Sequence, residues 1–172
     1  VVLTSSENAK SNFKHAVELS GIGHVTDRMM LNGRQGRLHE LQATKHAVTQ
    51  ACTEAGIGIG DLDFAEVHDC FTVNELLCAE AIGLSLPGRA GFDVMEGKFD
   101  PDSDCPINLS GGLKSKGHPV GATGASMHAL AYKQLTGAPI GVAAKGTPET
   151  AMTVNIGGSG VTNCVSVLRR IQ

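Results

Sequence analysis

Charged and large aromatic side chains are scarce in this chain of 172 residues. Asp, Glu, Lys and Arg together make up 18 % of the sequence, Trp is absent and Tyr occurs once. Basic residues are scattered and the formal net charge is −3, so we expect no nucleic-acid-binding surface. The apolar runs fall far short of the roughly 20 residues that span a bilayer, so we expect no membrane span.

Cysteine pairs of the Cys-x-x-Cys type are absent, and the five cysteines are odd in number. This pattern favours free thiols in a reducing compartment, either the cytoplasm or the matrix of a mitochondrion or peroxisome. The chain is long enough to bury a core without disulfide bonds, and we predict a single domain over residues 1–172. Scarce charge together with 22 glycines favours a large contact with another domain or subunit.

Alternating strand and helix patterns predict an α/β fold. Five segments have the apolar pattern of strands: residues 1–3, 16–23, 64–67, 151–156 and 161–168. Four segments have helical spacing or helix-end signals: residues 7–12, 38–55, 72–82 and 125–135. Residues 27–37 and 87–106 are expected to be loops. The order predicts a βαβαβαββ domain with a five-stranded mixed sheet covered by helices.

The segment His68-Asp69-Cys70-Phe71 lies between an expected strand and an expected helix. A His and a Cys two residues apart on such a turn can converge on one pocket, and the start of the following helix favours a thiolate. The alternative is a polar turn with an inert cysteine, because a free Cys is commonly just a small core residue.

A second segment, residues 110–124, carries five glycines and leads into an expected helix. Glycines this dense let the backbone approach a ligand or another loop closely. Pro119 restricts the residue before it to an extended conformation, which fixes the direction of His118. A phosphate-binding loop is a weaker interpretation, because the spacing matches neither the Walker motif nor the Gly-x-Gly-x-x-Gly motif.

The third segment, residues 155–160, joins the last two expected strands through a glycine-rich turn. Such a turn is an ordinary hairpin in most proteins, but it can also present backbone N–H groups to an oxyanion. A zinc site is a further possibility, although its candidate ligands match no known zinc spacing. Those candidate ligands are His68, Cys70, Cys105 and His118. We expect no metal.

Together the three segments resemble the C-terminal active-site loops of thiolases. Gly117-His118-Pro119 with its glycine-rich surroundings is similar to the Gly-His-Pro motif of that family. Most thiolases have Asn-Glu-Ala-Phe at the position of residues 68–71. The His-Asp-Cys-Phe version, followed by Asn74-Glu75, is typical of the sterol-carrier-protein type. The resemblance runs from about Val1 to Leu168 and rests on three motifs in the family's order.

The resemblance implies the fold of a thiolase C-terminal half and two departures from the usual site. The nucleophilic Cys and most coenzyme A contacts are expected in an N-terminal half that this chain lacks. Most thiolases also have a Cys, two residues before a Gly, in the last turn, where this chain has Asn155. In the sterol-carrier-protein type, the cysteine that matches Cys70 takes over the acid/base task.

The resemblance also implies four catalytic positions. The imidazoles of His68 and His118 would hold the enolate oxygen, and His118 would also deprotonate the nucleophilic Cys. Cys70 would move the proton at the α-carbon or at the leaving thiol. The backbone N–H of Gly157 would help to hold the tetrahedral oxyanion. The expected substrate-binding positions are Phe71, Asn108, Ser110, Gly117 and Pro119, of which Asn108 and Ser110 are expected mainly to shape the loop.

The implied function is acyl transfer between coenzyme A thioesters, with an acyl-CoA as substrate and no cofactor. The expected partners are a thiolase N-terminal half, on the same gene product or on a second chain, and further subunits of a homo- or hetero-oligomer. Two alternatives stay open. One is a thiolase-like retro-aldolase acting on a steroid side-chain thioester, against which Cys70 speaks. The other is a non-catalytic subunit that only binds acyl-CoA.

Overall fold

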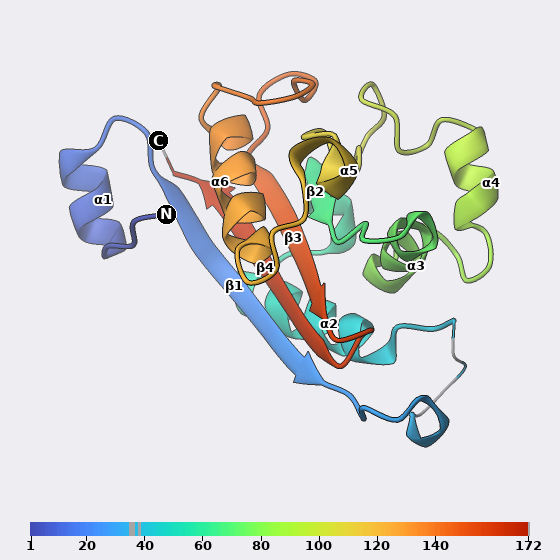
Figure 1. The fold of residues 1–172 in the computed structure, drawn as a ribbon. Helices are drawn as coiled ribbons and strands as arrows, with labels where there is room; N and C mark the ends of the chain where they lie inside the picture. Colours follow the sequence, from blue (N-terminus) through green and yellow to red (C-terminus); the bar gives the residue numbers. More distant parts are fainter. Residues whose placement is uncertain (35–36, 38, 172) are drawn as a thin grey trace.

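The computed structural model describes residues 1–34, 37 and 39–171 (Figure 1). Its four strands form one mixed sheet in the order β1-β4-β3-β2. The strands are β1 Val17–Thr26, β2 Phe64–Val67, β3 Thr150–Gly157 and β4 Thr162–Arg170. β4 runs antiparallel to both of its neighbours, β1 and β3, while β2 and β3 are parallel.

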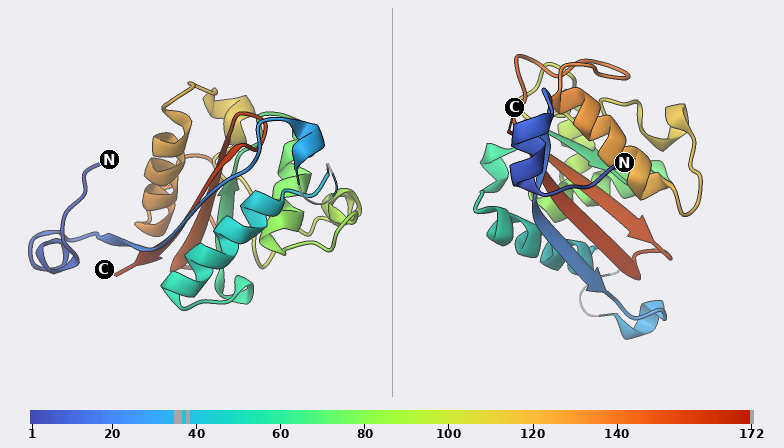
Figure 2. Two further views of the ribbon diagram at one scale, coloured as in Figure 1. Left: turned by 90° about the horizontal axis from the view of Figure 1, so that it is seen from below. Right: turned by 90° about the vertical axis from the view of Figure 1, so that its left-hand side faces the viewer.

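Helices cover both faces of this sheet. They are α1 Ser6–Asn12, α2 Gln42–Ala55, α3 Thr72–Ile82, α4 Ala90–Met95, α5 Gly112–Lys116 and α6 Thr123–Leu135, with short 3-10 helices at Leu31–Gly33 and Ile59–Asp61. Figure 2 shows the sheet between α6 on one side and α2 with α3 on the other. The larger buried cluster joins α2 and α3 to β3 and β4, and the smaller one joins α6 to β2 and β3.

Glycines in β1 let α2 lie directly on the strand. A Cβ atom on Gly21 would come within 2.1 Å of the carbonyl oxygen of Ala51, and one on Gly23 would come within 1.8 Å of that of Ala47. Both alanines are fully buried. Helix and strand backbones therefore touch here without side chains between them.

The outer edge of β1 is occupied by side chains of α2. The backbone N–H of Ile22 donates to a carboxylate oxygen of Glu54 at 2.7 Å, and that of His24 donates to the side-chain oxygen of Gln50 at 3.2 Å. These two donors point away from β4 and are nevertheless satisfied. The helix thus covers both the face and the edge of the strand.

The prediction of five strands was wrong. Residues 1–3 form no strand, and their side chains are 79 % to 92 % exposed. No strand in the described part of the chain pairs with these three residues, and α1, which follows them, buries none of its residues. At the opposite edge Ile107 forms a single parallel bridge with Ala65. Pro106 lacks an N–H and Asn108 has a φ of 55°, so the pairing cannot extend beyond that residue.

Two expected elements have the predicted bounds: the strand 64–67 is β2, and the helix 72–82 is α3. The strand expected at 16–23 extends to Thr26, and the helix expected at 38–55 begins at Gln42. Leu38 lies outside the described residues. The segment 27–37, expected as loop, contains the 3-10 helix Leu31–Gly33 in its described part.

The segment 87–106, predicted to be a loop, contains α4. This helix turns a carboxylate inward: Asp93 is buried, accepts a hydrogen bond from the Ser85 hydroxyl at 2.6 Å, and pairs with Arg89 at 3.2 Å and Lys98 at 3.1 Å. The Ser85 hydrogen bond is the main reason why the pKa of Asp93 is lowered. The two buried residues of α4 are Ala90 and Asp93, and because one of them is charged the sequence lacked the usual apolar helix pattern.

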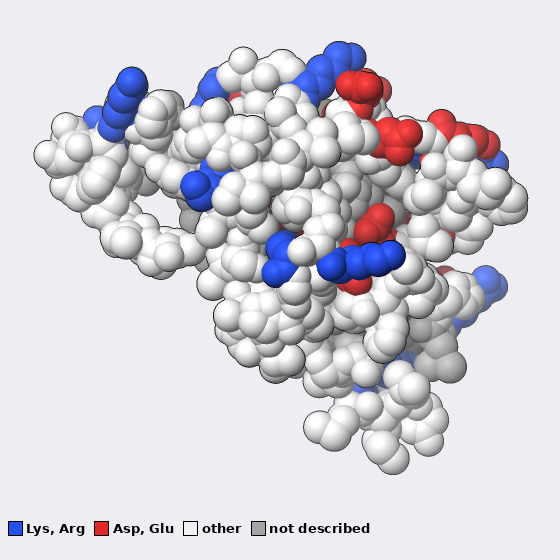
Figure 3. Space-filling model, turned by 45° about the horizontal axis from the view of Figure 1, so that its top comes forward, with Lys and Arg blue, Asp and Glu red and all other residues white. Residues whose placement is uncertain are grey.

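No helix in the described part of the chain is both long and apolar enough to cross a membrane. On the face drawn in Figure 3, basic and acidic groups are scattered over the surface, and some of them lie side by side.

Candidate active site

His68 lies immediately after β2, at the end of the sheet where β2 and β3 are parallel. Its side chain is 5 % exposed, and its Nδ1 lies 3.1 Å from the Oδ1 atom of Asn155 on β3. The side-chain amide of Asn74 donates to the His68 carbonyl oxygen. Burial and the nearby His118 lower the pKa of His68, so its ring is neutral at pH 7.

The structure brings the two predicted histidines together. The ring centroids of His68 and His118 are 4.9 Å apart, and the rings meet edge to face at 81°. His118 comes from the loop between α5 and α6 and is exposed. Two imidazoles from distant parts of the sequence thus lie in contact.

The Thr123 hydroxyl lies between two partners. Its oxygen is 3.1 Å from the carbonyl oxygen of Pro119 and 2.7 Å from Nδ1 of His118. When the hydroxyl donates to Pro119, its oxygen accepts from Nδ1–H, and the neutral His118 ring holds its lone pair on Nε2. When the hydroxyl donates to Nδ1, Nε2 carries the ring proton instead.

Cys70 and Phe71 lie at the exposed start of α3, and Phe71 is 74 % exposed. Cys164 on β4 is also exposed, while the remaining three cysteines are buried or partly buried. Burial raises the pKa of the Cys52 thiol and that of Cys78, and it raises the pKa of Cys105 to about 12. These three thiols are poor proton donors at neutral pH.

Asn108 shapes the loop around the site. Its side-chain oxygen accepts from the N–H of Val67 at 2.8 Å, and its side-chain nitrogen donates to Glu75 at 2.9 Å. Burial raises the pKa of Glu75. Both ends of the Asn108 amide are therefore used within the protein, just before the point where β2 leads into His68.

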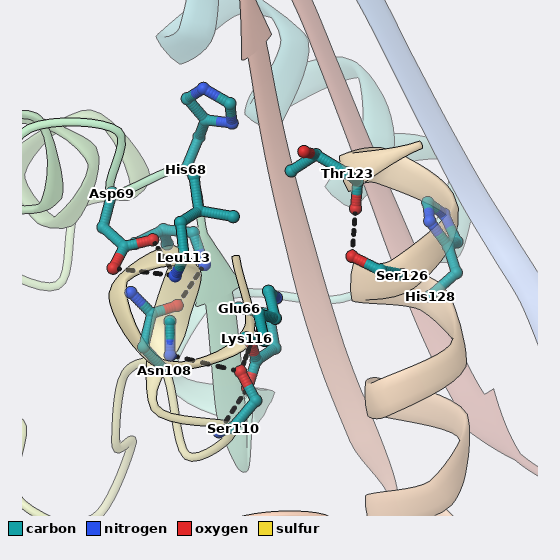
Figure 4. A network of polar contacts seen from close by, with 12 residues as sticks. Glu66, His68, Asp69, Asn108, Ser110, Leu113, Lys116, Thr123, Ser126 and His128 are labelled. Carbon is teal, nitrogen blue, oxygen red and sulfur yellow. Dashed lines mark hydrogen bonds and ion pairs between the residues drawn. The ribbon is translucent and has the colours of Figure 1, made fainter. Parts of the chain in front are cut away.

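Two carboxylates that flank His68 hold the segment of α5. Both oxygens of Asp69 accept from the Leu113 N–H, at 2.9 Å and 3.1 Å. Glu66 accepts from the Ser110 N–H at 3.0 Å and from its hydroxyl at 2.5 Å, and lies 3.6 Å from Nζ of Lys116. Figure 4 shows both sets of contacts beside His68.

The remaining predicted positions are backbone positions at the rim. Gly157 ends β3, two residues beyond Asn155, and is exposed. Gly117 is exposed with a φ of 86°, and it separates α5 from His118. The carbonyl oxygen of Pro119 accepts a hydrogen bond from the hydroxyl of Thr123, the residue whose oxygen lies beside Nδ1 of His118.

Several site residues were missed by the sequence analysis. Thr123, Glu66 and Lys116 contact or support the predicted residues, and Cys164 on β4 lies opposite Asn155. A charged residue in an otherwise buried strand was the available signal for Glu66. Within the described ranges, no three His, Cys, Asp or Glu side chains gather as a metal ion would require.

The family described as thiolase C-terminal domain-like matches residues 23–170. The chain belongs to this family. The acetyl-CoA acetyltransferase of Methanothermobacter thermautotrophicus is 35 % identical over 170 residues, which cover 99 % of this chain and 44 % of that protein. Sterol carrier protein 2 of Rattus norvegicus is 45 % identical over 94 residues, 55 % of this chain and 17 % of that protein. The resemblance to thiolases of the sterol-carrier-protein type is confirmed.

Two solved structures share the fold of this chain. A chain of the Ltp2-ChsH2(DUF35) aldolase superposes with a TM-score of 0.81 at 19 % identity, over 95 % of this chain and 42 % of that one. A monomeric SCP2-thiolase-like protein from Mycobacterium smegmatis gives a TM-score of 0.62 at 21 % identity, over 89 % of this chain and 29 % of that one. The present chain spans less than half of these proteins and of the acetyl-CoA acetyltransferase.

Proposed function

We propose that the chain is the C-terminal half of an acyl-CoA acyltransferase of the thiolase type. The reaction is thiolytic cleavage of a 3-ketoacyl-CoA, or the reverse Claisen condensation of two acyl-CoA molecules. The observation that carries the proposal is the contact between two imidazoles: His68 is buried with a lowered pKa, and His118 is exposed with its Nδ1 beside the Thr123 hydroxyl. The nucleophilic Cys belongs to the N-terminal half, on the same gene product or on a second chain.

His118 is the base of the proposal. A thiol becomes a good nucleophile when a neighbouring base takes its proton. In this proposal Nδ1–H donates to the Thr123 oxygen, so Nε2 is the nitrogen that can accept the proton of the thiol. His118 can then return this proton, or use the N–H to hold the thioester oxygen.

His68 is the second group that contacts the thioester oxygen. In the structure its Nδ1 faces the oxygen of Asn155, which leaves Nε2 as an acceptor in the neutral ring. To donate to an enolate oxygen, Nε2 must carry a proton. This happens when Asn155 turns its NH₂ group to Nδ1, or when the ring becomes charged. The orientation of the Asn155 amide therefore controls whether Nε2 of His68 is a hydrogen-bond donor or an acceptor.

Cys70 supplies the mobile proton at the substrate. It is exposed at the strand-to-helix turn, two residues after His68, whereas Cys52 and Cys78 are buried with raised pKa values. A thiol that exchanges protons with an α-carbon needs both access and acidity. Among these three, Cys70 has the access.

The rim binds the rest of the substrate. The N–H of Gly157 is assigned to the tetrahedral oxyanion, and Phe71, Gly117 and Pro119 are exposed around the site where an acyl chain would lie. Asn108 and Ser110 act through the shape of the loop, because their polar atoms are bound within the protein. The substrate is a coenzyme A thioester, and no further cofactor is needed.

A retro-aldolase is the second candidate, because one structural neighbour is an aldolase. That neighbour is 19 % identical and supports the fold alone. Thiolysis fits Cys70 better, since an aldolase does not need a thiol at this turn. A subunit that only binds acyl-CoA would have no use for the oriented lone pair on His118.

The test uses this chain together with its N-terminal half, on one polypeptide or on two, and this assembly is called the full-length protein below. We expect it to cleave acetoacetyl-CoA with coenzyme A, while the separate chain does not. His118→Ala should lower turnover by roughly a hundredfold or more and slow alkylation of the nucleophilic Cys. Unchanged alkylation with lost turnover would leave His118 on the oxyanion only. Cleavage of a steroid side-chain aldol thioester in place of thiolysis would establish the aldolase.

A further inference from the structure

A buried ion pair lies beneath the two imidazoles. Glu66 on β2 is 2 % exposed, and its carboxylate lies 3.6 Å from Nζ of Lys116, the last residue of α5. The Lys116 side chain is only 14 % exposed. The proposed reaction uses neither charge. A pair removed from water to this degree is weak evidence for stability, because desolvation offsets much of the attraction.

The two members occupy matching positions relative to the imidazoles. Glu66 lies two residues before His68, and Lys116 lies two residues before His118. Successive side chains alternate along a strand, so Glu66 and His68 lie on the same side of β2. The ion pair therefore links the two chain segments that deliver the two rings.

Further hydrogen bonds hold the segment of α5 in one orientation against the end of β2. Glu66 also binds the Ser110 N–H and hydroxyl ahead of α5, while Asp69 binds the Leu113 N–H inside it. The carboxylates on either side of His68 thus hold α5 at several points. A Cβ on Gly112 would lie 2.1 Å from a carboxylate oxygen of Asp69, so the helix sits against this group with no room to spare.

We propose that Glu66 and Lys116 are positioning residues that set the separation and angle between the imidazoles of His68 and His118. This inference rests on the proposed function for its kinetic consequence, but not for its structural one. The ion pair places the Gly117-His118 peptide over the end of β2, and the edge-to-face contact follows. The cation of Lys116 is also among the groups that lower the pKa of His68, after burial and His118.

The experiment uses the full-length protein with Lys116→Met, and Lys114→Met as its matched control. Lys114 lies on the same helix but is exposed. Lys116→Met should lower kcat by roughly a hundredfold with little change in KM, because displacing a catalytic group by about 1 Å has such an effect. Lys116→Arg should restore most of kcat, and Lys114→Met should match the wild type.

A second readout is independent of turnover. With ¹⁵N-labelled histidine, the His68 signal should titrate at a higher pH in Lys116→Met, and the His118 signal should shift, while both stay unchanged in Lys114→Met. If Lys116→Met does not fold, the neutral pair Glu66→Gln with Lys116→Met replaces it. A lower melting temperature with wild-type kcat and unchanged imidazole signals would overturn the inference. If the wild-type protein has no thiolase activity and Lys116→Met still shifts the imidazole signals, the positioning role is supported and the proposed function is refuted.

Discussion

The Thr123 hydroxyl oxygen lies 2.7 Å from Nδ1 of His118 and 3.1 Å from the carbonyl oxygen of Pro119, so one hydroxyl can set the tautomer of a proposed catalytic base. Thr123 is 3 % exposed at the start of α6. Replacing it with valine keeps the shape and removes the acceptor. The imidazole then loses its orientation and the preference for a lone pair on Nε2.

Thr123→Val should therefore lower kcat of the full-length protein by roughly ten- to a hundredfold, less than or equal to the roughly hundredfold lower limit for losing an acid–base group outright, because His118 itself is still present. Thr123→Ser, which keeps the hydroxyl, should stay close to the wild type. Steady-state thiolysis measures both variants. Equal losses in Thr123→Ser and Thr123→Val would contradict the tautomer argument and attribute the effect to packing.

Cys70 is expected to carry the α-proton. Cys70→Ala should stop exchange of the acetyl-CoA methyl protons in deuterated water, while the nucleophilic Cys of the other half can still be acylated. Cys70→Ser should leave only a trace of exchange, since a hydroxyl is far less acidic than a thiol. Mass spectrometry of the recovered acetyl-CoA measures the exchange.

Cys164→Ala is the matched control for Cys70, because Cys164 is also exposed and lies opposite Asn155. We expect this variant to exchange at the wild-type rate. Wild-type exchange in Cys70→Ala would move the acid/base role away from Cys70. Loss of exchange in Cys164→Ala alone would assign the acid/base role to Cys164.

The pH dependence of His68 has a predicted sign. Its pKa in the folded protein lies below the usual value of 6.5 because of burial and His118. The unfolded chain thus takes up this proton first on acidification. The stability contribution of neutral His68 is complete above the unfolded pKa and is lost as the pH falls through the folded pKa.

Asn155→Asp places a carboxylate against Nδ1 of His68 and favours the charged ring. The pKa of His68 should rise, and the acid limb of kcat/KM should move to higher pH. A histidine-labelled NMR titration and a pH–rate profile measure the two effects. A pKa that does not rise would show that the Asn155 contact does not govern the protonation of His68.

Backbone contact between β1 and α2 gives a stability prediction. Gly23→Ala places a methyl group 1.8 Å from the Ala47 carbonyl oxygen, and we expect a loss of about 3 kcal/mol or more in the free energy of unfolding. Gly60→Ala is the control, because a Cβ there meets nothing within 4 Å, and its effect should stay within about 0.5 kcal/mol. Denaturant unfolding of the full-length protein compares them. Equal effects at both positions would contradict the close-contact explanation.

Local patterns predicted the elements whose own residues determine them. β2 and α3 have the expected bounds: β2 is buried along its whole length, and Gly83 ends α3. α4 could not be found in this way, because its inward residue is Asp93, which Ser85 and Lys98 stabilise from outside the helix. The run Val1–Leu3 misled for the opposite reason: it is apolar, but no strand lies beside it.

The same distinction applies to the site. The positions of His68 and His118 followed from motifs, since each motif is continuous in the sequence. The Thr123 hydrogen bond and the pairing of Glu66 with Lys116 did not follow. The ion pair depends on how α5 lies against β2, which is tertiary information, and the Thr123 contact depends on the geometry of the turn that leads from His118 into α6.

The contacts of Gln50 and Glu54 with β1 limit how the sheet can grow. A free strand edge is a template for another chain, and natural proteins protect such edges from aggregation. Here the N–H groups of Ile22 and His24 are already bound by side chains of α2. A foreign strand would have to displace both side chains and leave a carboxylate without its donor. α2 therefore hinders the addition of a further strand to β1. Another chain that associates at this edge would have to do so through side chains and not through backbone pairing.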